Sequence, residues 1–240
     1  MSDVSEHRPL GAPVENWTPP RVPEGETLQG RYARLLPLAA DVHAAPLHRA
    51  YAGQDAIWDY MPCGPFRSES AYAEWIGETV ADPAHLFYAI TDLDHGTVGG
   101  VASYLRIAPV AGSIEVGNIS FGPDLQRTRA ATEAMVLMMN WAFDAGYRRY
   151  EWKCNALNAP SRRAAQRLGF SYEGVFRQAL VVKGRNRDTA WFAIIDREWP
   201  ALKQAYEQWL DPDNFDDTGR QIVSLGDLTG PIRVSSDPTL

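Results

Sequence analysis

The chain has 240 residues, and 45% of them are hydrophobic, which excludes a mainly disordered or collagen-like protein. Its formal net charge of −7 argues against sequence-independent binding to nucleic acid, because that binding depends on basic surface. No apolar run reaches the about 20 residues of a membrane span, and the start of the chain lacks the apolar core of a signal peptide. We therefore expect a soluble, cytoplasmic protein.

Cysteine and histidine are sparse and show no pattern. The two cysteines, Cys63 and Cys154, are too few for a disulfide scaffold or a zinc site. The five histidines show no ligand spacing, so we predict that the protein binds no metal.

The two ends of the chain differ in composition from its middle. Residues 1–30 contain five prolines and little apolar periodicity, which indicates an arm that lies along the surface or is partly disordered. Residues 211–240 contain six acidic residues and two arginines, which is typical of a solvated acidic extension. We expect a single folded domain over residues 31–210.

The first half of this domain shows strand and helix patterns in turn. Asp41 and Ser68 are candidate N-caps for two helices. In chain order the predicted elements are a strand over 32–38, helices over 41–52 and 68–80, and strands over 85–91, 98–106 and 113–121.

The strongest helix signal lies between Asp124 and Gly146. Apolar side chains recur there at steps of three and four residues, which predicts an amphipathic helix. The remaining predicted elements are a strand over 147–155, a helix over 159–168, strands over 172–182 and 188–195, and a helix over 198–210. This order predicts an α/β (α+β) domain with a mixed sheet.

Basic residues are concentrated in one part of the chain. Residues 126–187 contain twelve lysines and arginines but only four acidic residues, a local net charge of +8. Arg127 and Arg129 lie at the predicted start of the long helix, where free N–H groups and the helix dipole favour phosphate. We interpret this segment as a site for a compact polyanion, with a solvated basic face as the alternative.

A motif follows the strand predicted over 147–155. Residues 155–170 read Asn-Ala-Leu-Asn-Ala-Pro-Ser-Arg-Arg-Ala-Ala-Gln-Arg-Leu-Gly-Phe. This pattern resembles the second acetyl-CoA motif of the GNAT acetyltransferases, above all the RimJ/RimL type, in which Asn-x-x-Ser opens the short helix. Residues 113–121 resemble the central strand of that family, and the resemblance covers about residues 28–200.

The resemblance implies a GNAT-like fold, with a mixed, mostly antiparallel sheet flanked by helices. Two neighbouring parallel central strands would splay apart, here those that end near Phe121 and Asn155. Pantetheine would then bond to strand backbone at Ile119 and Phe121, and Asn155 and Asn158 would orient the thioester of acetyl-CoA. The pyrophosphate would be held at the start of the next helix, by Gln126, Arg127, Thr128, Arg129, Ala130, Ala131 and Thr132.

The phosphate loop departs from the family pattern at one position. The family usually reads Gln/Arg-x-x-Gly-x-Gly/Ala, whereas this chain has Arg129 at the first glycine. A residue with a side chain must keep a negative φ there or carry strain. We expect Arg129 to add a charge-assisted contact to phosphate, because Ala131 and Thr132 keep the helix start small; obstruction of the loop is the alternative.

Acetyl transfer to an amine needs a proton acceptor for the amine and a proton donor for the leaving thiolate. Glu115 is the only carboxylate on the strand over 113–121 and is our candidate base, with a salt-bridged strand residue as the alternative. Ser161 is our candidate acid, because RimJ/RimL-type proteins place a serine there, and a helix-capping role is the alternative. Many GNAT enzymes have a tyrosine where this chain has Ala165.

Residues 56–66 are rich in aromatic and turn residues and stand between the first two predicted helices, where GNAT enzymes admit their acceptor. We predict that Trp58, Tyr60 and Phe66 line the substrate mouth, with packing of the loop against the core as the alternative.

Together these features predict an enzyme that transfers an acetyl group from acetyl-CoA to a primary amine by direct attack on the thioester. The acceptor is either a protein N-terminus, as the RimJ/RimL resemblance implies, or a small amine such as an amino acid, a polyamine or an antibiotic. The rival function is a non-catalytic acyl-CoA-binding or regulatory module, motivated by the missing loop glycine. We expect no nucleic-acid or membrane partner, and a homodimer is common among relatives of this type.

Overall fold

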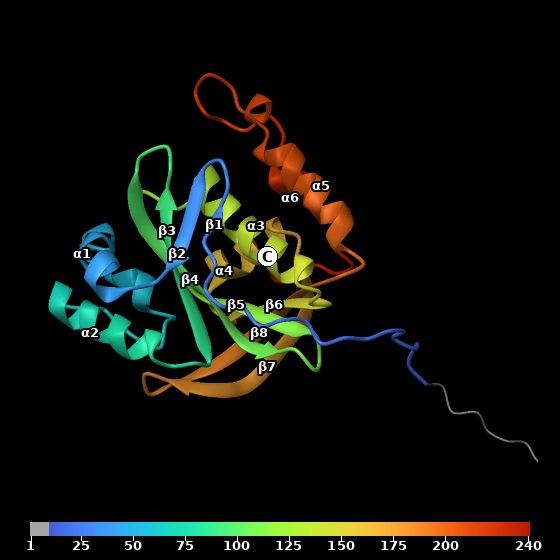
Figure 1. The fold of residues 1–240 in the computed structure, drawn as a ribbon, viewed down its shortest axis with the longest axis horizontal. Coiled ribbons are helices and arrows are strands. Elements are labelled where there is room, and N and C mark those ends of the chain that lie inside the picture. The colour runs from blue at the N-terminus through green and yellow to red at the C-terminus, as the bar shows by residue number, and fades with distance from the viewer. Residues whose placement is uncertain (1–9) are drawn as a thin grey trace, which may run out of the picture.

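The computed structural model describes residues 10–240, and a single mixed sheet organises them (Figure 1). Its eight strands lie in the order β1-β2-β3-β4-β5-β6-β8-β7, and every neighbouring pair is antiparallel except β5 with β6. The strands are β1 (Leu28–Gln29), β2 (Ala33–Pro37), β3 (His85–Asp92), β4 (Thr97–Ala108), β5 (Ser113–Phe121), β6 (Arg149–Asn155), β7 (Ser171–Val182) and β8 (Arg185–Ile195). The helices are α1 (Ala40–Ala50), α2 (Glu69–Val80), α3 (Arg129–Asp144), α4 (Ala159–Arg167), α5 (Trp199–Leu210) and α6 (Leu225–Thr229), with short 3-10 helices η1 (Asp55–Trp58) and η2 (Pro212–Asn214).

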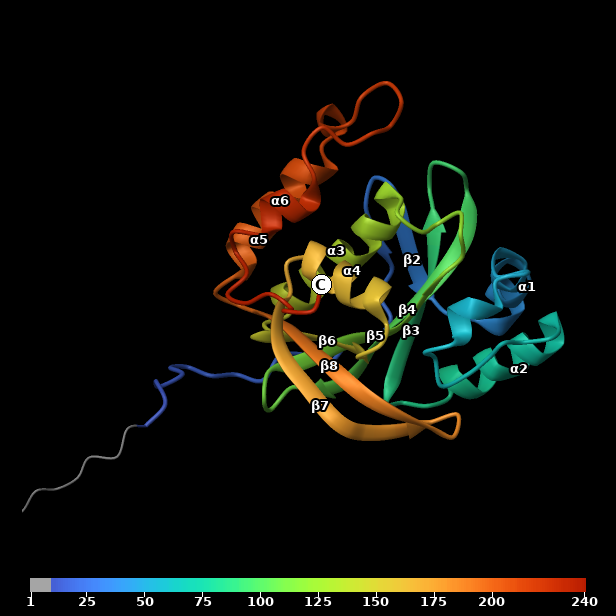
Figure 2. The same cartoon turned by 180° about the vertical axis from the view of Figure 1, so that it is seen from behind.

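The predicted order of elements and the mixed, mostly antiparallel sheet flanked by helices are confirmed. Helices α3, α4 and α5 cover one face of the sheet, and α1 and α2 lie against the opposite face of β3 and β4 (Figures 1 and 2). Alternate residues of β3 divide between the two cores: Tyr88 packs with α3, and Phe87 packs with α2. This period of two is what a strand buried on both faces requires.

The two helix caps expected in the first half have different outcomes. Ser68 caps α2, because its hydroxyl accepts the N–H of Ala71 at 3.1 Å. The capping prediction for Asp41 is wrong, since α1 begins at Ala40 and Asp41 lies in its first turn. The N-cap is Ala39, which has no capping side chain, and its own N–H donates to Nδ1 of His43 within the helix at 3.0 Å.

The hydrogen bond from the N–H of Ala39 to His43 should make the stability of the protein depend on pH. Burial lowers the pKa of His43 below its usual 6.5, and a protonated ring cannot accept a hydrogen bond. The unfolded chain therefore binds this proton more readily, so the stabilisation is complete above about pH 6.5 and is lost as the pH falls below that value. Denaturant midpoints measured from about pH 8 to pH 5 should fall more steeply for the wild type than for H43Q, whose amide oxygen accepts at any pH. Parallel slopes would contradict this prediction.

Residues 211–240 pack as part of the domain, so the prediction of a solvated acidic extension is wrong. Leu225 and Thr229 of α6 are fully buried, and Asp237 forms a buried ion pair with Arg162 of α4. Two other acids serve local turns: Asp211 accepts the N–H of Asp213, and Asp216 accepts three hydrogen bonds. The remaining three, Asp213, Asp217 and Asp227, are exposed, so the acidic composition reflects turns and one ion pair as well as solvation.

The proline-rich start of the chain lies on the surface in its described part. Most residues from 10 to 30 are exposed, and the guanidinium of Arg21 stacks 4.8 Å from the ring of Trp141. Residues 1–9, which belong to the predicted arm, lie outside the described residues. The division of the chain at residue 30 stays a prediction.

Two further features concern residues 10–240 as a whole. No helix among them has both the length and the apolar character needed to cross a membrane. Nor do three or more of their histidine, cysteine and acidic side chains form a cluster suited to a metal ion. Cys63 and Cys154 are both free thiols.

Candidate active site

Strands β5 and β6 separate halfway along their length. Their parallel pairing ends at Val116 and Trp152, and residues 117–121 and 153–155 then diverge. Asn118 has a φ of 51° where the register with β4 shifts, and such a bulge bends a strand away from its neighbour. The predicted splay of the central strands is confirmed.

The backbone of β5 presents hydrogen-bonding groups to the gap between the two strands. The N–H of Gly122 donates to the carbonyl of Gly99, on the β4 side, at 2.8 Å. Because successive peptide groups of a strand point in opposite directions, those of Ile119 and Phe121 face the gap. Gln126 donates from Nε2 to the carbonyl of Phe121 at 2.7 Å. Main-chain contacts of Ile119 and Phe121 with pantetheine fit this geometry and stay a prediction.

The loop before α3 differs from the expectation at Arg129. Thr128 is the N-cap of α3, and its hydroxyl accepts the N–H of Ala131 at 3.0 Å. Arg129 is the first helical residue, so no strain arises there. The left-handed residue is Arg127, with a φ of 65°, two positions before the one at which the family pattern has its first glycine.

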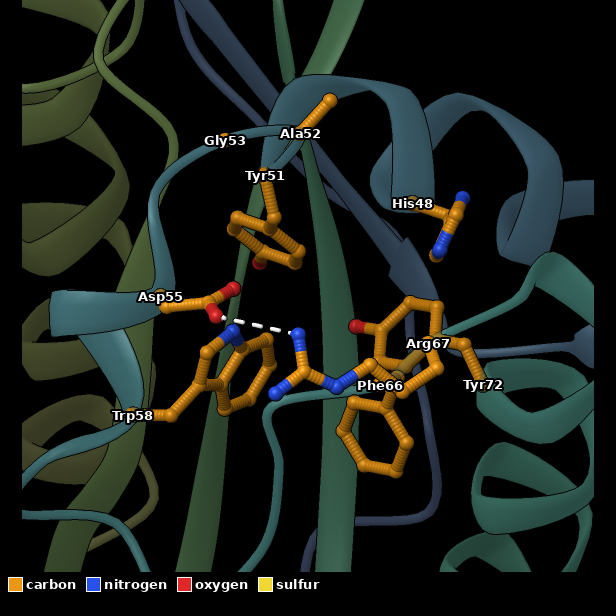
Figure 3. A pocket seen from close by; sticks show the side chains of 9 residues that line it. All are labelled: His48, Tyr51, Ala52, Gly53, Asp55, Trp58, Phe66, Arg67 and Tyr72. Carbon is orange, nitrogen blue, oxygen red and sulfur yellow. Dashed lines mark hydrogen bonds and ion pairs between the residues drawn. The ribbon is translucent and has the colours of Figure 1, made fainter.

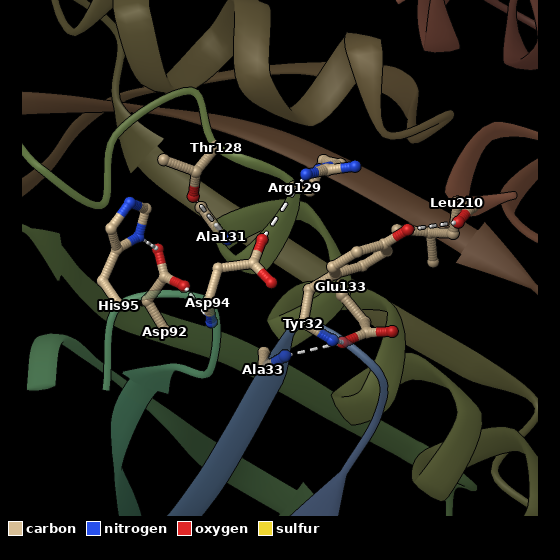
Figure 4. A network of polar contacts seen from close by, with 10 residues as sticks. All are labelled: Tyr32, Ala33, Asp92, Asp94, His95, Thr128, Arg129, Ala131, Glu133 and Leu210. Carbon is tan, nitrogen blue, oxygen red and sulfur yellow. Dashed lines mark hydrogen bonds and ion pairs between the residues drawn. The ribbon is translucent and has the colours of Figure 1, made fainter. Parts of the chain in front are cut away.

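Three partners hold the side chain of Arg129, and Figure 4 shows two of them, Asp94 and Tyr32. Its guanidinium lies 3.5 Å from the carboxylate of Asp94, and it stacks on the rings of Tyr32 and Phe215 at 4.6 and 4.8 Å. The expected contact between this side chain and phosphate would require it to leave these partners. We therefore assign to phosphate the N–H of Arg129 rather than its guanidinium.

Free donors and an unneutralised cation meet at the start of α3. Among the described residues, the N–H groups of Arg129 and Ala130 have no acceptor, as expected for a first helical turn. Arg167 of α4 donates to the hydroxyl of Thr132 at 3.2 and 3.3 Å and has no acidic partner within residues 10–240. Burial and the charge of Arg127 lower the pKa of Arg167. An anion placed here would gain both N–H donors and a guanidinium.

Arg167→Gln is expected to weaken the binding of acetyl-CoA about 10- to 100-fold, because a charge-assisted contact to phosphate is lost. The measurement is a calorimetric titration at two salt concentrations, and the salt dependence should also become weaker. Arg220→Gln removes the same charge from an exposed position in the C-terminal segment and should leave the affinity unchanged. Equal losses in the two variants would show that only the total charge matters.

The turn between β6 and α4 carries the second half of the motif. Asn158 caps α4 by accepting the N–H of Ser161 at 3.1 Å, and Asn155 accepts the N–H of Leu157 at 2.9 Å. Both amides thus use their oxygens locally, and among the described residues their Nδ2 groups have no acceptor. The hydroxyl of Ser161 accepts the indole N–H of Trp152 at 3.0 Å. Because an indole only donates, the hydrogen of Ser161 is left for a sulfur or oxygen partner; within the protein this is Cys154, whose pKa the hydrogen bond from Ser161 lowers against the larger, opposite effect of burial.

Glu115 lies on the face of β5, β6 and β8 opposite α3, which we call the charged face after Glu115, Glu151 and Lys153. Glu115 is 2% exposed. One of its oxygens accepts from Arg106 at 2.7 Å, and the other lies 2.8 Å from Nζ of Lys153. Lys153 is also 2.7 Å from Glu151. The salt-bridged alternative for Glu115 is thus present, and a role as base requires water to carry the proton.

The aromatic loop of residues 56–66 divides between core and surface. Trp58 is 4% exposed and packs against Tyr72 in the core under α1 and α2. Phe66 is half-buried against the same two rings. Tyr60 is 36% exposed and donates to the carbonyl of Leu157, beside the end of β6, at 3.2 Å. Core packing therefore describes Trp58, whereas Tyr60 lies where an acceptor would approach.

An open cavity of about 230 Å³ lies beside this loop. Trp58, Phe66 and Tyr51 form its aromatic wall, and an ion pair of 3.3 Å between Arg67 and Asp55 crosses it (Figure 3). The hydroxyl of Tyr51 donates to the backbone of Ser120 in β5 at 3.0 Å. The cavity therefore lies beside β5, and its use by an acceptor stays a prediction.

Several contacts at the site were not predicted. Lys183, at the tip of the β7–β8 hairpin, donates to the carbonyls of Trp58 and Gly64 at 2.8 Å each. More than 115 residues separate these partners in sequence, so no local pattern could reveal the contact. Lys153 could have been noticed as a lysine between buried strand residues, but its partner Glu115 follows only from the register of β5 with β6.

A comparison with known families completes this description. Residues 33–171 match the family model described as an acetyltransferase (GNAT) domain. The chain belongs to the GNAT acetyltransferase family. This GNAT protein is 45% identical to a GCN5-related N-acetyltransferase from Brucella melitensis, with a TM-score of 0.88 over 90% of this chain and 100% of that one.

Two more proteins similar to this GNAT acetyltransferase support the assignment. A probable acetyltransferase of the GNAT family from Chromobacterium violaceum is 41% identical, with a TM-score of 0.76 over 81% of this chain and 98% of that one. The uncharacterized N-acetyltransferase YnaD of Bacillus subtilis is 25% identical over 150 residues, which are 62% of this chain and 86% of that protein. The predicted family and the predicted class of enzyme, an acetyltransferase, are confirmed.

Proposed function

We propose that this protein transfers the acetyl group of acetyl-CoA to a primary amine, either a protein N-terminus or a small molecule. The observation that carries the proposal is the gap between β5 and β6, which opens beside the free N–H groups of α3 and the unneutralised Arg167. An extended chain with a phosphate at one end matches this arrangement, because strand backbone binds extended chains and helix starts bind phosphate.

Each residue of the gap has an assigned task. The backbone of Ile119 and Phe121 holds the pantetheine, and the Nδ2 groups of Asn155 and Asn158 donate to the thioester oxygen. The amine nitrogen forms a bond to the carbonyl carbon as the carbon–sulfur bond breaks. Ser161 donates its hydrogen toward the departing sulfur, and water passes the amine proton to Glu115. Holding amine and thioester together supplies much of the rate.

The helical conformation of Arg129 weakens the case for a non-catalytic acyl-CoA-binding module. That rival rests on the missing loop glycine, and Arg129 begins α3 without a left-handed φ, so its side chain causes no backbone strain there. The RimJ/RimL branch, a cytoplasmic location and a homodimer are further parts of the proposal that rest on the sequence alone.

The test is a titration of the purified protein with acetyl-CoA, CoA and ADP, followed by an assay of CoA thiol release with amine acceptors. We expect micromolar binding of acetyl-CoA and thiol release that depends on the acceptor. Binding without acceptor-dependent release would favour the non-catalytic module. No binding at millimolar acetyl-CoA would overturn the proposal.

A further inference from the structure

The acidic side chains of the charged face are all paired with cations. Glu115 pairs with Arg106 and Lys153, and Glu151 pairs with Lys153 and Arg149. Arg149 continues the chain of charges to Glu173 on β7, at 2.6 Å. Every carboxylate of this network is thus already in contact with at least one guanidinium or ammonium group.

One more cation lies on the same face. Lys153 is in register with Trp191, and Asn155 is in register with Thr189, so alternate residues of β8 share the side of Lys153. The next position in this series is Arg187, two residues from Thr189 and thus just beyond the end of β6. Arg187 therefore lies on the charged face at the mouth of the gap between β5 and β6.

Arg187 has no anionic partner among residues 10–240. It is half-buried, and its Nε is buried without any hydrogen-bond partner. Burial lowers the pKa of Arg187 and the charge of Arg106 lowers it further, whereas Cys154, and to a smaller extent Glu115, act in the opposite sense. None of these groups forms a hydrogen bond or an ion pair with Arg187 among residues 10–240.

A half-buried guanidinium with an unsatisfied Nε–H is costly to maintain. A ligand that supplies an anion would remove that cost. The planar fork of a guanidinium matches the two oxygens of a carboxylate. The unpaired positive charge of Arg187 also disfavours the binding of a polycation at this position.

We propose that Arg187 binds a carboxylate of the acceptor, so that the acceptor is an amine carrying a carboxylate close to its amino group. This inference rests on the proposed function and narrows its acceptor class: it disfavours polyamines. The carboxylate has two sources, the α-carboxylate of a free amino acid or an acidic side chain at the N-terminus of a peptide. Arg187 is a specificity-determining residue in either case.

The experiment compares acceptors that differ only in the carboxylate. Free amino acids are paired with their α-amides, and a peptide amide beginning Asp-Ala-Ala is paired with one beginning Asn-Ala-Ala; spermidine is added as a polycation. For each, kcat/KM is measured in the wild type, in Arg187→Gln and Arg187→Lys, and in Arg197→Gln. Arg197 is exposed just after the far end of β8 and is the matched control.

In at least one of the pairs, the kcat/KM of the wild type for the acceptor with the carboxylate should exceed that for the matching amide by about tenfold or more, as expected for a charge-assisted, two-pronged contact. Arg187→Gln should abolish that preference without changing the affinity for acetyl-CoA, Arg187→Lys should restore it in part, and Arg197→Gln should keep it. If acetyl-CoA still binds, equal kcat/KM values for all acceptors overturn the inference. Absence of acetylation of every acceptor overturns it as well. Absence of acetyl-CoA binding overturns the proposed function together with it.

Discussion

Glu115→Gln is expected to lower kcat by about 100- to 10,000-fold, the usual contribution of a general base, while the affinity for acetyl-CoA changes by less than about twofold. Glutamine keeps the shape of the side chain but cannot take up the amine proton. Its amide oxygen can still accept from Arg106 or Lys153, so the contacts at 2.7 and 2.8 Å are partly kept. Steady-state kinetics with a saturating acceptor and calorimetry with acetyl-CoA measure the two effects separately.

The matched control is Glu151→Gln, because Glu151 contacts the same Lys153 at 2.7 Å. Glu151 lies in register with Glu115 on the paired part of β5 and β6. The Glu151→Gln substitution therefore removes the same charge from the same network without removing the proposed base. If the two variants lose activity equally, Glu115 acts through the charge network and not as a proton acceptor. If Glu115 is the base, Glu115→Gln should also remove the acidic limb of the pH profile of kcat/KM. If its role is structural, the limb should remain.

Asp237→Ala is expected to destabilise the protein by about 3–5 kcal/mol, the cost of leaving one partner of a buried ion pair without the other. The carboxylate of Asp237 accepts from Nε and Nη2 of Arg162 at 2.6 Å each. Arg162 is 8% exposed, so water cannot replace the lost partner. Urea denaturation of the wild type and the variant measures the difference in the free energy of unfolding.

Two further variants separate the ion pair from the general effect of changing this segment. Asp227→Ala alters an exposed acid of the same segment and should cost less than about 0.5 kcal/mol. Arg162→Met combined with Asp237→Ala should be more stable than Asp237→Ala alone, because no buried charge is left unpaired. If the double variant is the less stable one, the ion pair is not what holds the segment.

Asp237→Ala should also reduce kcat. Arg162 donates from Nη1 to the carbonyl of Ala156 at 2.8 Å, in the turn between Asn155 and Asn158. The C-terminal segment thus fixes the turn that is proposed to hold the thioester. Activity measured well below the unfolding midpoint separates this effect from lost stability.

The elements of the fold were predictable because their patterns are local. The strand over 113–121 has the predicted bounds, and α2 begins after the predicted cap at Ser68. The start of α1 was not predictable in the same way, because its N-cap is Ala39, whose side chain cannot accept a hydrogen bond. The C-terminal segment was missed for a related reason: composition cannot distinguish an acid in solvent from one paired like Asp237.

The parts of the candidate site that lie in one sequence motif were predictable. The parts that strands distant in sequence bring together were not. Asn155, Asn158 and Ser161 belong to one turn, so their spacing alone brings them together. Lys153 contacts Glu115 only through the parallel register of β5 with β6, and Arg187 shares their face only through the antiparallel register of β6 with β8. Those registers depend on packing of the whole sheet and leave no local signature.

The bulged strand β5 has a consequence for the protein without its ligand. Four residue pairs join β5 to β6, so among residues 10–240 the N–H groups of Ile119 and Phe121 remain unpaired in the middle of the sheet, whereas the carbonyl of Phe121 already accepts from Gln126. Unpaired strand groups are templates for pairing with another chain. A bound pantetheine would satisfy them as a neighbouring strand does. The ligand is therefore expected to slow amide hydrogen exchange at these two residues and to suppress aggregation of the protein through strand pairing.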